Sequence, residues 1–175
     1  MRLVCACLML GACAGLALAL DANRPVAASA AAQNQEDVNN CLAIIVNRSN
    51  PLESVSLAEL RKIFLAERNH WPDGHRITIV MQESGQPERK TVLRDIYRMS
   101  EPDFTRYFLQ KAFTGEALST PKTLTNSTGV RKFVFNVPGA IGYVRAGEVD
   151  GTVKAIRVDG RLPGEKGYRM QLGVR

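Results

Sequence analysis

The residues best placed to do chemistry lie between a predicted strand and a predicted helix. Residues 77–81 are mostly apolar and β-branched, the polar loop 82–87 follows, and residues 88–96 carry apolar side chains on one side only. Ser84 and Gly85 stand where the loop turns into the helix, where backbone N–H groups and a hydroxyl can converge on an anion. The alternative is structural: Ser84 caps the helix and Gly85 lets the chain turn.

A second group of hydroxyl side chains lies further along the chain. Ser127, Thr128 and Gly129 precede apolar residues at helical spacing, beginning with Val130. This pattern predicts a short helix whose N-terminus offers a second cluster of hydroxyl and N–H groups. Thr128 is therefore a further candidate for contact with an oxyanion.

The sequence offers little for catalysis or for metal binding. His70 and His75 flank the turn sequence Trp-Pro-Asp-Gly at 71–74, and histidines around a turn are typically solvated. Trp71 is expected to cover the core. No paired carboxylates, Ser/His/Asp set or Cys/His pair stands out in the sequence, so we predict neither an enzyme nor a cofactor or metal.

The net charge favours an anionic partner. The chain has 175 residues and a formal charge of +6, which falls to +5 without Arg2, Asp21 and Arg24. A small oxyanion, a membrane surface and a polyanion all suit this excess. Aromatic residues are few and do not alternate with basic runs, so a nucleic-acid module is disfavoured.

Residues 1–30 are predicted to be a secretory signal peptide. Arg2 precedes the uncharged run 3–20, and the Ala-Ser-Ala sequence at 28–30 suits cleavage. A transmembrane helix is disfavoured because many residues of the run are Ala or Gly. A lipoprotein signal ending at Cys13 is disfavoured because the following residues stay apolar. We expect a periplasmic or secreted protein with no stable membrane span after the signal is removed.

The remainder is the size of one domain. We expect a flexible leader at 31–41, a domain at 42–160 and a basic tail at 161–175. Cys41 is the one cysteine beyond the signal, and a lone thiol is either buried beside the first strand or free to form an intermolecular bond. Burial is the expected state.

The order of elements predicts an α/β fold, with a mixed, mainly parallel sheet flanked by helices. Ligands in such sheets bind at the carboxyl ends of strands, where loop 82–87 would lie. Strands are predicted at 42–46, 77–81, 140–144 and 153–158, and helices after Ser56, near 88, after Ser100 and near 130.

Four motifs, in this order, resemble the phosphate-binding proteins of high-affinity phosphate ABC transporters. They are Leu-x-x-Ile-Phe-Leu at 60–65, Trp-Pro-Asp-Gly at 71–74, a strand ending in Ser84 and Gly85, and Pro-Gly-Ala-Ile-Gly-Tyr-Val at 138–144. The resemblance runs over about residues 42–145. It implies a fold like one lobe of a type 2 periplasmic binding protein, and binding of a solute in place of catalysis.

The sequence departs from the family in two ways. Family proteins have two lobes that close on phosphate, and this chain resembles only the second. Their second-lobe loop resembles Arg-x-Asp-Gly-Ser-Gly-Thr; here Ser84 and Gly85 match it, but the Arg, Asp and Thr positions hold Val80, Gln82 and Gln86.

Two neighbouring residues offer replacements for the missing charges. A shift of one position puts Glu83 in place of the Asp, and Arg89 restores a positive charge one turn into the helix. The resemblance thus implies weak phosphate or oxyanion binding. The candidate ligand-binding residues are Glu83, Ser84, Gly85, Gln86, Arg89 and Thr128.

A second function stays open beside this one. The chain can instead be a non-transporting envelope module that has lost ligand binding and docks a protein partner or self-associates. The missing lobe favours this alternative, whereas the Ser-Gly loop and the positive charge favour solute binding. An exposed apolar patch would point to a partner or a homodimer.

Overall fold

A computed structural model describes residues 38–115 and 120–173. The predicted signal peptide at 1–30, the lipidation alternative at Cys13 and the leader at 31–37 lie outside the described residues. Within the described part, no helix combines the length and the apolar character needed to span a bilayer.

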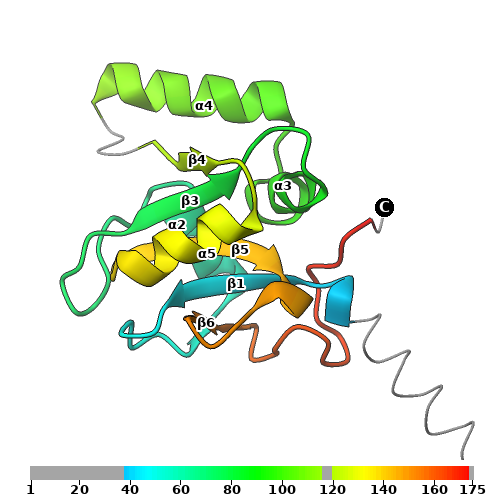
Figure 1. Cartoon of the computed structure of the whole chain (residues 1–175). Coiled ribbons are helices and arrows are strands. Elements are labelled where there is room, and N and C mark those ends of the chain that lie inside the picture. Colours follow the sequence, from blue (N-terminus) through cyan, green and yellow to red (C-terminus); the bar gives the residue numbers. More distant parts are fainter. Residues whose placement is uncertain (1–37, 116–119, 174–175) are drawn as a thin grey trace, which may run out of the picture.

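A five-stranded sheet forms the centre of the domain, with the strand order β4-β3-β5-β1-β6 (Figure 1). Strand β3 runs parallel to β4 and β5, whereas β1 is antiparallel to both β5 and β6. Only β1 therefore opposes the common direction, and the predicted mixed, mainly parallel α/β sheet is confirmed. The strands are β1 (Leu42–Asn47), β3 (Thr78–Gln82), β4 (Lys122–Leu124), β5 (Ala140–Arg145) and β6 (Val153–Ala155).

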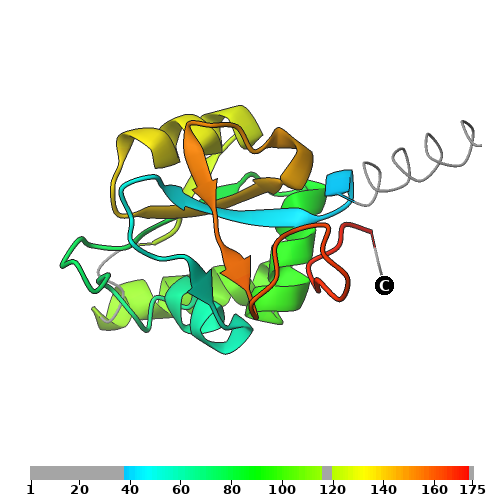
Figure 2. The ribbon, with the colours of Figure 1, turned by 90° about the horizontal axis from the view of Figure 1, so that it is seen from below.

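Helices cover both faces of the sheet. Figure 2 shows α5 on one side, and α2 and α4 on the other. The helical elements are α2 (Leu57–Phe64), α3 (Pro87–Val92), the π-helix η1 (Leu93–Tyr97), α4 (Glu101–Thr114), α5 (Ser127–Asn136) and the 3-10 turn η2 (Ala146–Glu148).

Strand β1 is buried on both faces, as its continuous apolar run predicts. Successive side chains of a strand point to opposite faces. Accordingly, Ile44 and Val46 join the core beneath α2 and η1, and Ala43 and Ile45 join the core beneath α5. The sheet therefore separates two hydrophobic cores.

A glycine sets how closely α5 approaches the sheet. A Cβ atom at Gly142 of β5 would lie 2.8 Å from Val130 Cγ1 of α5 and 3.4 Å from Val134 Cγ2. The close packing of helix and strand thus depends on the missing side chain.

The predicted helix starts and buried residues are mostly confirmed. Ser56 and Ser100 accept hydrogen bonds from the backbone N–H groups of Glu59 and Asp103, at 3.1 and 3.3 Å. Cys41 is buried, as expected. Trp71 is buried too, and its indole N–H donates to the Gly139 carbonyl at 3.0 Å.

Three short strands differ from the prediction. The expected strand at 153–158 is two strands in different sheets, because β7 (Arg157–Val158) pairs in parallel with β2 (Ser54–Val55). Strand β4 lies in a segment predicted to be a loop. Strands of two or three residues carry no detectable periodicity, which explains these errors.

The C-terminal segment packs on the main core. Tyr168 is buried and donates its hydroxyl to the Leu42 carbonyl at 2.6 Å, and the Leu42 N–H donates to Met170 O at 2.9 Å. The described part of the predicted basic tail, residues 161–173, thus covers the start of β1.

Candidate functional site

Loop 82–87 leaves the carboxyl end of β3 and leads into α3. Gly85 has a φ of 92°, which favours glycine over other residues, so its predicted role in the turn is confirmed. The N-cap of α3 is Gln86, not Ser84, and the structural interpretation of Ser84 as the helix cap is wrong. The hydroxyl of Ser84 remains available for another role.

A cavity of about 540 Å³ lies against this loop; we call it the loop cavity. Its rim carries the cations Lys90, Arg94 and Arg98, whereas Leu93 and Met99 give it an apolar wall. Among the described residues, Lys90 and Arg98 form no ion pair or side-chain hydrogen bond. The residues around the cavity are Ser84, Gly85, Lys90, Leu93, Arg94, Arg98, Met99, Ser100 and Glu101.

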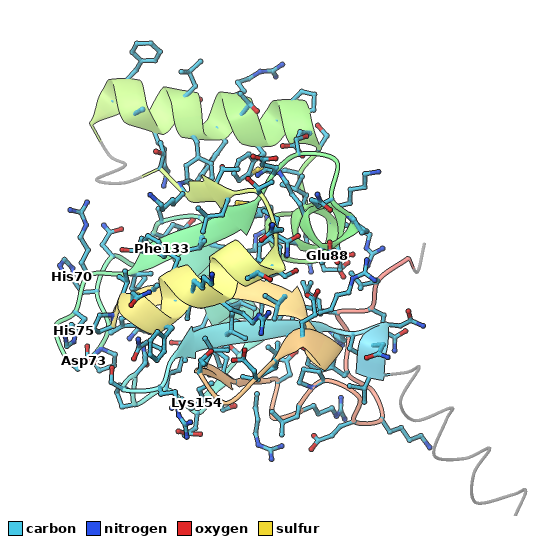
Figure 3. All side chains as sticks on the ribbon, in the orientation of Figure 1. His70, Asp73, His75, Glu88, Phe133 and Lys154 are labelled. Atoms are coloured by element: carbon cyan, nitrogen blue, oxygen red, sulfur yellow. The ribbon has the colours of Figure 1, made fainter. Side chains whose placement is uncertain are left out.

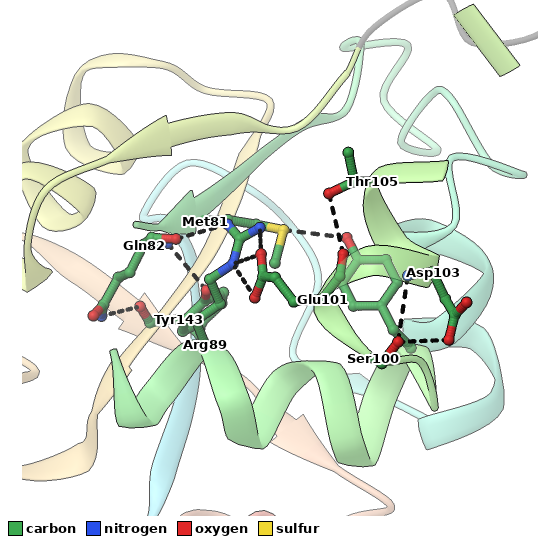
Figure 4. Close-up of polar contacts among 9 residues, drawn as sticks. Met81, Gln82, Arg89, Ser100, Glu101, Asp103, Thr105 and Tyr143 are labelled. Atoms are coloured by element: carbon green, nitrogen blue, oxygen red, sulfur yellow. Dashed lines mark hydrogen bonds and ion pairs between the residues drawn. The ribbon is translucent and has the colours of Figure 1, made fainter. Parts of the chain in front are cut away.

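The charge of Arg89 is matched inside the protein (Figure 4). Its guanidinium is buried, its Nη2 lies 2.5 Å from Glu101 Oε1, and its Nη1 donates to the Gln82 carbonyl at 2.8 Å. It also lies 5.0 Å from the centre of the Phe104 ring. Arg89 therefore ties the end of β3 to the start of α4.

Hydrogen bonds also tie loop 82–87 to β5 and to the start of α5. The Gln82 N–H donates to the Tyr143 hydroxyl at 3.0 Å, and the Gln82 side-chain amide donates to Ser127 Oγ at 3.2 Å. Burial raises the pKa of Tyr143, which keeps its hydroxyl neutral. Glu83 is exposed and accepts a hydrogen bond from Thr125 at 3.1 Å.

An ion pair between a buried carboxylate and a partly exposed arginine joins α3 to β5. Glu88, labelled in Figure 3, is buried, and its Oε1 accepts a hydrogen bond from Arg145 Nε. The two histidines lie at the opposite end of the domain, where His75 Nδ1 is 3.2 Å from Asp73 Oδ1. No group of three potential metal ligands occurs within residues 38–115 and 120–173.

The predicted site residues are only partly brought together. Ser84 and Gly85 share the loop cavity, Glu83 and Gln86 flank them, and Arg89 is engaged within the protein. Thr128 lies elsewhere, on a separate cavity of about 180 Å³ with Arg131.

Sequence reasoning missed the three cations of the loop cavity. Lys90, Arg94 and Arg98 recur at every fourth position, a spacing that places side chains along one face of a helix. This basic stripe was a detectable signal. It would have indicated a positive surface beside Ser84.

Known proteins share this fold and part of this sequence. The chain is 28% identical over 130 residues to the phosphate-binding protein PstS of Bacillus subtilis (strain 168). It resembles the binding proteins of phosphate transporters. The prediction from the motifs is thereby confirmed. The match covers 71% of this chain but only 38% of the relative, and the chain matches no protein-family model.

Two solved structures share the fold. One is an ABC-type phosphate transport receptor from Vibrio cholerae, with a TM-score of 0.58, 21% identity, and coverage of 70% of this chain and 48% of that one. The other is a substrate-binding protein assigned to a phosphate ABC transporter, with bound phosphate, from Clostridium perfringens. Its TM-score is 0.58 at 21% identity, with coverage of 73% and 49%. The chain thus spans about half the length of each of these structures.

Proposed function

We propose that this chain is an exported solute-binding module of the phosphate-transporter type. It binds phosphate, or another small oxyanion, weakly in the loop cavity. The observation that carries the proposal is the meeting of Ser84, Gly85 and the unpaired Lys90 on one cavity at the carboxyl end of β3. This is the edge of an α/β sheet where ligands bind.

Each of the three residues has a different role in this proposal. The Ser84 hydroxyl donates to an anion oxygen, Gly85 leaves room for the anion near the backbone, and the Lys90 ammonium supplies charge. Arg89 acts indirectly, because its hydrogen bond to the Gln82 carbonyl fixes where the loop begins. Glu83 and Gln86 border the site, and Thr128 belongs to another cavity.

The same geometry makes the binding weak. Ser84, Gly85 and Lys90 are exposed, and charge interactions in water-rich surroundings are strongly reduced. The matched region covers only 38% of the curated relative and 48% of the Vibrio cholerae structure, so much of each relative has no counterpart in the region compared. We expect a dissociation constant of about 0.1–1 mM.

Calorimetric titration of the purified full chain with phosphate, and then with sulfate, tests the proposal. Saturable heat should weaken strongly in Ser84→Ala and in Lys90→Ala. Lys62→Ala is the matched control, because Lys62 is an exposed helical lysine that does not line the loop cavity. An absence of heat at several times the expected dissociation constant, or equal weakening in all three variants, would reject the proposal.

A second candidate function rests on apolar side chains of α4. Phe113 is 84% exposed and Leu109 is 55% exposed, whereas Phe104 and Phe108 of the same helix are buried. An exposed apolar face of this kind favours self-association or a protein partner. Sedimentation velocity over a range of concentrations tests it: a Phe113→Ser change should abolish any dimer, and a strictly monomeric wild-type chain would exclude self-association.

A further inference from the structure

A second cavity, of about 410 Å³, also borders η1; we call it the arginine cavity. Arg94 and Leu93 of η1 line the loop cavity, Asp95 and Ile96 line the arginine cavity, and Arg98 borders both. The full set of residues around the arginine cavity is Ser56, Leu57, Ala58, Arg61, Asp95, Ile96, Arg98, Asp159 and Arg169.

Three arginines from different parts of the chain line this cavity. Arg61 comes from α2, Arg98 follows η1, and Arg169 comes from the C-terminal segment. Within the described residues, none of the three forms a hydrogen bond or an ion pair through its side chain. Like charges gathered around one cavity repel each other, and a bound anion would remove that cost.

The two carboxylates at the cavity already have partners. Asp95 pairs with Arg94, with Oδ1 2.6 Å from Nε and Oδ2 2.8 Å from Nη2. Asp159 Oδ1 accepts a hydrogen bond from the Leu57 N–H at 2.9 Å, so this carboxylate occupies the first N–H group of α2. The positive charge of the three arginines therefore exceeds the negative charge that faces them.

The backbone beside the cavity is in an unfavourable conformation. Of the three non-glycine residues with positive φ in the described chain, two line this cavity: Arg98 with φ of 54° and Asp159 with φ of 51°. Arg98 is the C-cap of η1, so the way in which this helix ends places the arginine at the cavity. The backbone therefore fixes where two of the charged residues of the cavity lie.

We propose that the arginine cavity is a second anion site, separate from the loop cavity. Its ligand is a small polyvalent anion that carries two or more phosphate or carboxylate groups. Guanidinium groups bind both kinds of group through paired hydrogen bonds, and three of them suit a ligand with several such groups. The volume lies within the range of small-molecule sites and exceeds what a single orthophosphate needs.

Titration of the purified full chain with pyrophosphate, and separately with citrate, tests this site. In Arg61→Gln and in Arg169→Gln, the dissociation constant should rise by roughly tenfold, the loss expected for one charge-assisted contact. Lys62→Gln is the matched control, since it removes the same charge from the next residue of α2 without touching the cavity. Ser84→Ala should leave the binding unchanged, because Ser84 lines only the loop cavity.

The outcomes separate this proposal from phosphate binding at the loop cavity. Saturation by pyrophosphate alone supports the site and assigns it to phosphate compounds, and saturation by citrate alone supports it and assigns it to carboxylates. No saturable binding of either anion, equal weakening in Lys62→Gln, or loss confined to Ser84→Ala would overturn it. Unchanged thermal unfolding of Arg61→Gln and Arg169→Gln would exclude misfolding as the cause of weaker binding.

Discussion

Replacing Arg89 by alanine distinguishes a structural role of this residue from direct ligand contact. The guanidinium is 8% exposed in its side chain and faces Glu101, which is 34% exposed. The change removes the ion pair, the hydrogen bond to the Gln82 carbonyl and the stacking on Phe104. Glu101 would lose its ion-pair partner, and the Gln82 carbonyl at the end of β3 would lose its donor.

The expected loss of stability follows from this burial. Breaking a buried ion pair by removing one partner costs about 3–5 kcal/mol. Because Glu101 is partly exposed, water replaces part of the lost contact, and we expect a smaller loss, about 2–3 kcal/mol. For a chain of this length, that corresponds to a fall in melting temperature of roughly 5–10 °C.

Thermal unfolding followed by circular dichroism measures the effect of Arg89→Ala. Arg106→Ala is the matched control: its side chain is 79% exposed and lies 3.8 Å from Asp103, so we expect a loss below about 0.5 kcal/mol. In a double-mutant cycle with Glu101→Gln, the two changes should couple by at least about 1 kcal/mol. An unchanged melting temperature together with complete loss of phosphate binding would refute the structural role and make Arg89 a ligand.

Three further predictions concern the fold. Gly142→Ala should destabilise the domain by about 1–3 kcal/mol in urea unfolding, since the added Cβ would lie 2.8 Å from Val130; wild-type stability would contradict the close packing of α5. Trp71→Phe should cost about 0.5–1.5 kcal/mol, because the Gly139 carbonyl loses the indole N–H and keeps only the Thr78 N–H as a donor, and a neutral change would contradict a contribution of the indole hydrogen bond to stability. Burial raises the pKa of Tyr168 above its unfolded value of about 10, so its contribution to stability is present below pH 10 and is lost as the pH rises further. The melting temperature should therefore fall above pH 10, and less steeply in Tyr168→Phe; equal slopes in both proteins would contradict the assignment.

Local sequence signals were sufficient for much of the fold. The caps at Ser56 and Ser100 and the apolar run at 42–46 depend on neighbouring residues only, and they are confirmed. Strands β2 and β7 are two residues long and exist because residues about a hundred positions apart pair with each other. Such pairings leave no local periodicity, so they could not be predicted.

In the candidate site, too, local sequence predicts some residues, whereas others come together only in the folded chain. Gly85 was predictable because a tight turn requires its conformation locally. The partner of Arg89 was not, because Glu101 lies twelve residues away and reaches it only through the packing of α4. Arg61, Arg98 and Arg169 meet only in three dimensions, and no spacing along the chain indicates their cavity.

Phosphate binding in the loop cavity is tested most directly by following backbone amide resonances of the labelled protein while phosphate is added. Phosphate should cause saturable shifts of the amides of Ser84, Gly85 and Lys90, with small changes at Arg61 and Arg169. Shifts confined to Arg61 and Arg169, or no shifts at millimolar phosphate, would contradict binding in the loop cavity.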